Sequence, residues 1–410
     1  MGSWSARIPS ALAALLLLAV TVAIGHRLFP GTRTGLVAGI ALATTGRFFW
    51  QARWAEPDML FSAGVGLAVL GWLLLRDGKP AAGLPVAVLG LAGAILSKGP
   101  VLFAIVIPGI LTGTFLLPRP RRRGAVLWFA VAWLAAVGIV SIWLLLAVRR
   151  GYPLGDVLHR QVVERAESGL HHRQPWHYYL WNLPVDLMPW TVFLPAAILD
   201  LRRDGRFRRE RLWLAVWPAV VLALFSLSPE KRSLYLLPVL PALALWIGSA
   251  LERAWLPSAG VGDGDRPAGP SRRRGPWIAL GLASALFVLA APFLRLADAR
   301  GKSNRAVAEE LVRRAEGCRS AALQRSEGSP AVAFYAAPVL GEKLVFLPNR
   351  QAAAAYLRGA NACILLTHRA AGEEIARALG DRAEAIPALA RSNDEWLFLK
   401  TRPSPGPPSP

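Results

Sequence analysis

Long apolar runs recur along most of the chain, and short polar stretches separate them. A helix needs roughly 17–25 mainly apolar residues to cross about 30 Å of hydrocarbon. Runs of about this length predict ten membrane spans, near residues 8–25, 34–49, 59–75, 81–96, 100–117, 124–148, 180–199, 212–228, 234–250 and 276–295. The pattern therefore predicts a polytopic α-helical membrane protein.

The pattern changes after about residue 297. Short β-like runs, among them AVAFY (331–335), ACILLT (362–367) and EWLFLK (395–400), alternate with helical patterns such as NRAVAEELVRRAEG. This alternation is typical of a small α/β domain. We therefore expect a transmembrane region at residues 1–296, an α/β domain at 297–400 and a disordered tail at 401–410.

The composition is that of a membrane protein. The net charge alone decides little, but the positions of the charged residues along the chain are informative. The 410 residues are 54% hydrophobic and carry a net charge of +21. A basic chain suggests a nucleic-acid partner. Here most arginines lie in short clusters between apolar runs, as the positive-inside rule expects. We therefore expect a membrane partner and no nucleic acid.

The arginine clusters also predict an orientation. One set of alternate loops holds 19 Lys and Arg, and the other set holds 10 mixed with acids and histidines. The first set is predicted to be cytoplasmic. Residues 47–57, Lys98, the loop at 149–179, residues 229–233 and the C-terminal domain then share the outer side.

Two features of the chain ends follow from this topology. Ten spans with an outer C-terminus put Met1 outside as well, and no A-x-A cleavage site follows the first apolar run. We therefore expect an initial membrane span to be missing from this reading frame. The two cysteines, Cys318 and Cys363, exclude a cysteine metal cluster. An outer location permits one disulfide between them, and the sequence leaves its formation open.

The stretch RFFWQARWAEPDML carries the first candidate residues, Arg53, Glu56 and Asp58. Charges beside a bilayer are costly unless they face water or have a function. A carboxylate at this boundary can act as a general base or bind a metal. The alternative is that Asp58 caps the next helix, since Asp is favoured at helix starts.

Lysines on the outer side form the second group. In LSKGPV, Lys98 interrupts a long apolar stretch, and Gly99 and Pro100 predict a tight bend that offers the lysine to an anion. A lysine that merely reaches the interface is the alternative. In SLSPEKRSLYLLPVLP, Lys231 and Arg232 precede Tyr235, and such a group suits the phosphate of a lipid headgroup.

The longest outer loop spans residues 151–182 and has no zinc-like spacing. A substrate loop above a lipid-facing groove is one interpretation, and a solvated loop is the other. Its polar residues include His159, Arg160, Glu164, Arg165, His171, His172, Arg173 and His177. Together the four stretches place a carboxylate, several cations and a phenol on one face, as transfer from a lipid-linked phosphate requires.

These stretches also occur in a familiar order. ARWAEPDMLF, LAGAILSKGPV, HHRQPWHYYL to MPW, and LFSLSPEKRSLYLLPVLPALAL resemble the lipid-dependent glycosyltransferases related to protein O-mannosyltransferases, with the aminoarabinose-to-lipid-A transferase branch the most similar. The resemblance implies the GT-C fold, the bacterial inner membrane and an extracytoplasmic active site. It implies transfer of a sugar from a polyprenyl-phosphate donor to lipid A, another glycan or protein.

The resemblance assigns roles to individual residues. Asp58 is implied to be catalytic, and Glu56, its neighbour in the same stretch, is added as a second catalytic candidate. The residues implied to bind the lipid phosphate or sugar are Lys98, Arg165, His172, Lys231 and Tyr235. The cations Arg53 and Arg232, which lie in the same stretches, are added to them as candidates.

The chain also departs from the family pattern. The family's principal acid lies in a first outer loop that this chain lacks, so we expect a fragment whose activity as given is left open. Val162, where relatives often have a polar residue, puts a metal site in doubt. No cofactor is required by the motifs, and a divalent metal ion is left open.

Two functions from other classes remain open at this stage. A transporter or flippase of lipid-linked sugars also needs polar groups, but it tends to show internal repeats and charges near the bilayer midplane. No clear repeat is visible here. The other is a truncated, non-catalytic subunit that binds the lipid sugar without releasing polyprenyl phosphate.

Overall fold

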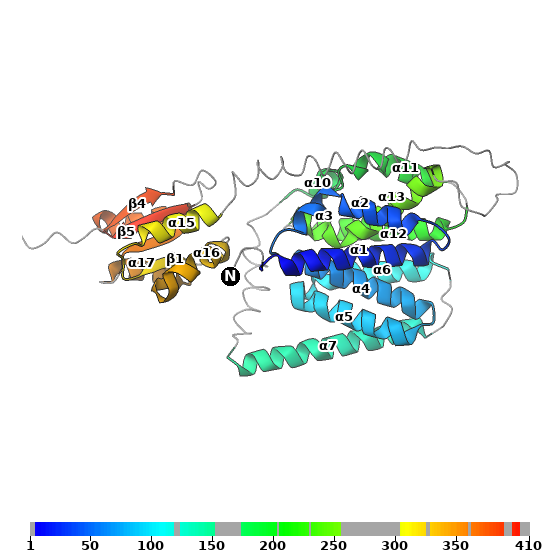
Figure 1. Ribbon diagram of the computed structural model, residues 1–410, viewed down its shortest axis with the longest axis horizontal. Helices are drawn as coiled ribbons and strands as arrows, with labels where there is room; N and C mark the ends of the chain where they lie inside the picture. Colours follow the sequence, from blue (N-terminus) through cyan, green and yellow to red (C-terminus); the bar gives the residue numbers. More distant parts are fainter. Residues whose placement is uncertain are drawn as a thin grey trace, which may run out of the picture. The chain divides into compact units, whose positions relative to one another are not determined.

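The computed structural model describes residues 5–118, 124–151, 174–202, 205–228, 231–255, 304–324, 329–359, 362–388 and 396–401. The chain divides into two compact units, Gly2–Phe287 and Val288–Pro410. The described part of the first unit is helical, and that of the second is an α/β sheet (Figure 1). The predicted span at 276–295 and the predicted tail beyond Thr401 lie outside the described residues.

The helices of the first unit follow the apolar runs. They are α1 (Ile8–Leu28), α2 (Thr34–Ala43), α3 (Gly46–Gln51), α4 (Asp58–Arg76), α5 (Pro80–Lys98), α6 (Phe103–Leu116), α7 (Ala125–Arg149), α10 (Tyr178–Asp186), α11 (Leu194–Asp200), α12 (Arg208–Leu227) and α13 (Leu240–Trp255). Among the described residues, three 3₁₀ turns join some of them: η1 (Gly99–Leu102), η3 (Trp190–Phe193) and η4 (Ser233–Val239). Six helices in the described part are long and apolar enough to cross a membrane, or seven if one bent pair is a single span.

Two predicted spans are not continuous helices, and a third forms the 14-residue helix α6, which is shorter than a span. The described residues therefore support six or seven of the ten predicted spans. The run at 34–49 breaks between α2 and α3, where the hydroxyls of Thr44 and Thr45 donate to carbonyls in α2. Side-chain bonds of this kind compete with the helical ladder. The run at 180–199 bends by 105° between α10 and the helices that follow. Pro189 lies at this bend, and its ring cannot continue a regular helix.

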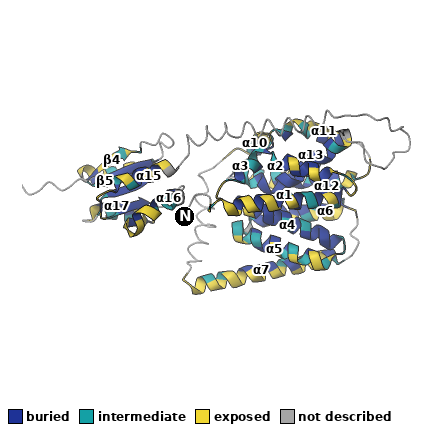
Figure 2. Cartoon of the chain, in the orientation of Figure 1, coloured by how far each residue is buried: buried dark blue, intermediate teal, exposed yellow. Residues whose placement is uncertain are grey.

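Small residues let α4 and α5 pack closely. A Cβ on Gly90 would lie 2.4 Å from the backbone nitrogen of Ala68, and one on Gly71 would lie 2.5 Å from that of Ala87. Helix pairs in membranes favour such small residues because dispersion contacts replace the hydrophobic drive. The close packing leaves α4 largely buried, whereas α7 is exposed along most of its length (Figure 2).

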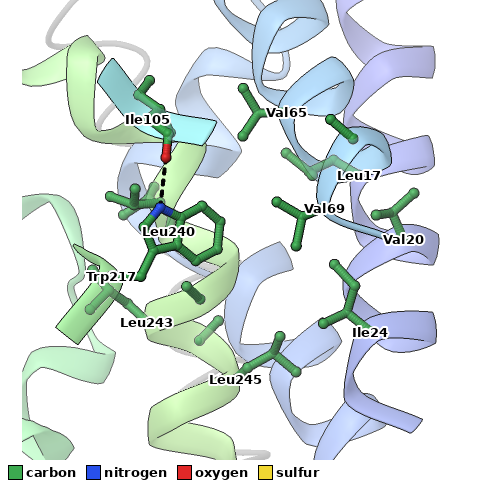
Figure 3. Close-up of a cluster of buried hydrophobic side chains, with 14 of the residues drawn as sticks. Leu17, Val20, Ile24, Val65, Val69, Ile105, Trp217, Leu240, Leu243 and Leu245 are labelled. Atoms are coloured by element: carbon green, nitrogen blue, oxygen red, sulfur yellow. Dashed lines mark hydrogen bonds between the residues drawn. The ribbon is translucent and has the colours of Figure 1, made fainter. Parts of the chain in front are cut away.

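Indole hydrogen bonds add to the apolar core around α4. Trp217 of α12 donates to the carbonyl of Ile105 at 2.9 Å (Figure 3). Trp213, one turn earlier, donates to the carbonyl of Gly109 at the same distance. Val65 of α4 lies in the cluster that these helices enclose (Figure 3). Buried indole N–H groups need such partners, so these bonds fix the register of α12 on α6.

The second unit is built on a five-stranded sheet. Its elements are α15 (Asn304–Arg314), β1 (Ala321–Gln324), α16 (Ser329–Leu340), β2 (Leu344–Leu347), α17 (Arg350–Arg358), β3 (Ile364–His368), α18 (Arg369–Leu379), β4 (Ala383–Pro387) and β5 (Trp396–Thr401). The strand order is β2-β1-β3-β5-β4. β1 runs parallel to β2 and β3, and β5 runs antiparallel to β3 and β4.

The α/β prediction is confirmed for this unit, with one local correction. The runs ACILLT and EWLFLK form β3 and β5. The run AVAFY was expected to be β-like, but it lies in α16. The reason is its continuation: Val332, Ala336 and Leu340 are buried at a spacing of four, which is helical. A disulfide joins Cys318 to Cys363, a pairing that the sequence left open.

Candidate active site

An ion pair between α4 and α5 forms the centre of the candidate site. Asp58 is the first residue of α4, and Lys98 is the last residue of α5. The two helices are antiparallel neighbours of 19 residues each, so the start of α4 meets the end of α5. The ammonium of Lys98 bonds the carboxylate of Asp58. Acids at helix starts and bases at helix ends also match the helix dipoles.

Two aromatic rings complete the surroundings of Lys98. Its Nζ atom lies 4.8 Å from the ring centre of Tyr235 and 5.8 Å from that of Phe61. Such contacts are attractive because the ring face is electronegative. Gly99, with a φ of +68°, ends α5 in a conformation that residues with a Cβ rarely adopt, and it turns the chain sharply after the lysine. Three predicted site residues from separate segments therefore meet.

Lys231 lies two residues before η4, the turn that contains Tyr235, and is almost fully buried. Only 4% of the residue is exposed. Its ammonium donates to the carbonyls of Ser228 and Gln174, the latter at 3.1 Å. Within the described residues it has no carboxylate partner. A buried charge without a counter-ion is costly, so this ammonium is suited to an anion.

The other predicted residues are placed differently. Glu56 accepts a hydrogen bond from Gln51, and Arg53 covers the ring of Phe49 at 4.8 Å, so both contact helix α3. Arg232 precedes η4 and is partly exposed. The predicted Arg165 and His172 lie outside the described residues.

Sequence reasoning missed a second ion pair at this end of the helices. Arg47 of α3 donates from Nε to Oδ1 of Asp186 at 2.8 Å. Asp186 is the last residue of α10 and is 5% exposed. The sequence could have pointed to Asp186, because it lies in the apolar run at 180–199, and an ionisable residue in such a run is a functional candidate by default.

The described residues do not form a metal site. No three His, Cys, Asp or Glu side chains come together among them. Asp58 is occupied by Lys98, and Glu56 by Gln51. The acids placed at this end therefore do not fit a divalent cation, which needs several oxygen ligands.

An open cavity of about 420 Å³ lies next to Glu56. Its walls come from the start of α1, the segment before α4 and the end of α5. The lining residues are Ala6, Pro9, Ser10, Ala55, Glu56, Pro57, Leu60, Leu96 and Ser97. The cavity is apolar apart from Glu56 and two serines, so it suits a group that is itself amphipathic.

Comparison with known proteins identifies the relatives of this chain. Residues 1–147 match the dolichyl-phosphate-mannose-protein mannosyltransferase family, and residues 155–319 match the Alg9-like mannosyltransferase family. An undecaprenyl phosphate-alpha-4-amino-4-deoxy-L-arabinose arabinosyl transferase of Pseudomonas aeruginosa strain UCBPP-PA14 is 32% identical over 253 residues, which are 60% of this chain and 45% of that protein. A counterpart numbered 1 in Pseudomonas fluorescens strain Pf0-1 is 28% identical, over 61% of this chain and 44% of that protein. The match thus spans less than half of these relatives.

Solved structures show the same fold. ArnT from Cupriavidus metallidurans bound to undecaprenyl phosphate superposes with a TM-score of 0.65 at 18% identity, covering 98% of this chain and 85% of that chain. Its apo state gives 0.64, also at 18% identity, covering 97% and 84%. The predicted GT-C-like membrane fold with a small C-terminal α/β unit is confirmed. Over these segments the chain is therefore similar to the dolichyl-phosphate-mannose-protein mannosyltransferase family and to undecaprenyl phosphate-aminoarabinose arabinosyl transferases, the resemblance that its motifs predicted.

Proposed function

We propose that this chain is a membrane glycosyltransferase that moves a sugar from a polyprenyl-phosphate donor to an acceptor outside the cytoplasm. The observation that carries the proposal is the buried ammonium of Lys231, which bonds only carbonyls among the described residues. It lies four residues before Tyr235, whose ring covers Lys98. A lipid phosphate bound there supplies the counter-charge that Lys231 lacks.

The chemistry follows from where charge develops during transfer. When the sugar leaves, negative charge builds on the phosphate of the polyprenyl carrier. Lys231 and Lys98 stabilise that charge, and such preorganised electrostatic stabilisation is usually the largest catalytic term. Asp58, held by Lys98, orients the acceptor or supports the base that deprotonates it. The carrier's apolar tail lies against the lipid-exposed helices.

The outer location of the site has two supports. The loops beside Asp58, Lys98 and Lys231 are poor in Lys and Arg compared with the loops between them. The second unit contains the Cys318–Cys363 disulfide, and disulfides persist in oxidising compartments such as the bacterial periplasm. A bacterial inner membrane with the site and the second unit on the periplasmic side satisfies both observations.

The donor and acceptor classes are proposed from the relatives and the site. The P. aeruginosa relative is an arabinosyl transferase for an undecaprenyl phosphate sugar, so undecaprenyl phosphate-aminoarabinose is the first donor to test. Lipid A is the first acceptor, followed by other glycans and protein. The cavity beside Glu56 opens at the same end of the helices and is the proposed entrance for the acceptor.

Sugar transfer by the chain in proteoliposomes tests the proposal. Radiolabelled undecaprenyl phosphate-aminoarabinose is supplied with lipid A, and both labelled lipid A and released undecaprenyl phosphate are measured. We expect Lys231→Met to lower transfer by roughly 10²-fold, the size of a lost charge-stabilising donor. Lys79→Met, at the opposite end of α5, is the control and is expected to keep parental activity.

Each alternative function gives a different result in this assay. Donor binding without release of undecaprenyl phosphate would show a binding subunit. Movement of the donor across the bilayer without transfer would show a transporter. Parental transfer by Lys231→Met would refute the phosphate site itself.

A further inference from the structure

The six-residue helix α3 binds two different parts of the candidate site. From Arg47, Nε and Nη2 contact Oδ1 of Asp186 at 2.8 and 2.7 Å. Four residues later, Gln51 donates to Oε2 of Glu56 at 2.5 Å. Residues four apart share one face of a helix. Helix α3 therefore connects the end of α10 with the segment that precedes Asp58.

Backbone and indole bonds reinforce the Arg47 contact. The amide of Gly46 donates to the carbonyl of Met188 at 2.8 Å. The indole of Trp190 donates to the hydroxyl of Thr44 at 3.0 Å. These bonds join the break between α2 and α3 to the bend after α10. Because the carboxylate of Asp186 is buried, its charge-assisted bond to Arg47 has one well-defined geometry.

Helix α10 carries this connection to the phosphate side of the site. Gln174, four residues before α10 begins, accepts a hydrogen bond from Lys231. Helix α10 also packs against η4, the turn that contains Tyr235. The acidic segment at residues 56–58 and the buried lysine are thus linked through α3 and α10.

We infer that Arg47 and Asp186 are positioning residues that set the spacing between the acidic segment and the Lys231 segment. The inference rests on the proposed function, because it gives that spacing its purpose: the acceptor and the donor phosphate must meet at a fixed separation. Misplacement by about 1 Å is enough to lower such a reaction by roughly 10²-fold.

A distance measurement tests the positioning without any ligand. Trp54 and Trp176, which are 38% and 69% exposed, are replaced by cysteine and spin-labelled in the full chain. The native disulfide does not react with the label. We expect a narrow distance distribution in the parent and a shifted or broadened one in Arg47→Ala. Arg47→Asp combined with Asp186→Arg is expected to restore it.

The control removes an ion pair elsewhere whose arginine is similarly exposed but whose acid, Asp77, is 40% exposed against 5% for Asp186. Arg27 bonds Asp77 at 2.6 Å, and its side chain is 26% exposed against 25% for Arg47. Arg27→Ala is expected to leave the label distances unchanged. If Arg47→Ala does not fold, Arg47→Gln replaces it, because it keeps part of the side chain and a hydrogen-bond donor.

Binding of undecaprenyl phosphate to unlabelled protein in nanodiscs provides the functional reading. We expect Arg47→Ala to bind about tenfold more weakly than the parent, Arg47→Lys to recover part of the loss, and Arg27→Ala to bind as the parent does. Unchanged distances or unchanged affinity in folded Arg47→Ala would overturn the inference. If the parent binds no undecaprenyl phosphate, the proposed function fails, and the label distances alone decide whether Arg47 positions the two segments.

Discussion

Removing the charge of Lys98 should destabilise the helical unit in a way that a second substitution reverses. Lys98→Met keeps the apolar stem but leaves Asp58, which is 7% exposed, without its ammonium partner. Breaking a fully buried pair costs about 3–5 kcal/mol, and exposed pairs are worth about 1 kcal/mol or less. The Lys98 side chain is 21% exposed, so this pair lies between the two cases, and we expect Lys98→Met to lower the free energy of unfolding by about 2 kcal/mol.

A double-mutant cycle isolates this energy. Asp58→Asn removes the acid, and the double variant removes both charges, which is often nearly neutral for a buried pair. We therefore expect each single variant to be less stable than the double variant. The coupling energy, which is the sum of the two single losses minus the loss in the double variant, should then exceed about 2 kcal/mol. Unfolding of the full chain in mixed micelles, followed by circular dichroism during an SDS titration, measures the four free energies.

The control and the refuting result come from the same experiment. Lys79 lies at the other end of α5, is exposed and forms no ion pair with the described residues, so Lys79→Met should change the free energy by no more than about 0.5 kcal/mol. Additive effects of Lys98→Met and Asp58→Asn, within about 0.5 kcal/mol, would show that the two side chains do not interact. That result would also remove the geometric basis for a shared site.

Two further predictions concern the packing of the helices and the second unit. Gly90→Ala places a methyl group 2.4 Å from the backbone of Ala68, so it should lower the free energy of unfolding by about 1–3 kcal/mol in the same SDS titration. Gly93→Ala, with nothing within 4 Å, is the control and should not destabilise the protein; equal effects of the two variants would contradict close packing of α4 on α5. Cys318→Ser removes a cross-link to Cys363 across 45 residues, worth up to about 4 kcal/mol, and should speed proteolysis of the second unit in the intact chain. Proteolysis at the parental rate would contradict a stabilising disulfide.

Local patterns in the sequence were enough to predict the fold class of this protein and to select several residues that the structure brings together. Apolar length predicts a membrane-spanning helix because the bilayer thickness is fixed. The polar residues between the spans, including Asp58, Lys98, Lys231 and Tyr235, were visible as exceptions in an apolar background. The sequence placed these four on one face, and the structure brings Asp58, Lys98 and Tyr235 into direct contact.

Other features needed the tertiary structure. Arg47 and Asp186 are 139 residues apart, and the sequence contains nothing that selects one as the partner of the other. In the sequence, the segments that contain the break after α2 and the bend after α10 are ordinary apolar runs. Hydropathy shows how long an apolar run is, but it does not show where the helix axis breaks or bends. The surroundings of Lys231 also depend on the folded chain: its ammonium donates to two carbonyls and contacts no carboxylate among the described residues. Hydrophobicity is a property of each residue and can be read along the chain, whereas the pairing of charges is decided only when packing brings distant segments within hydrogen-bonding distance.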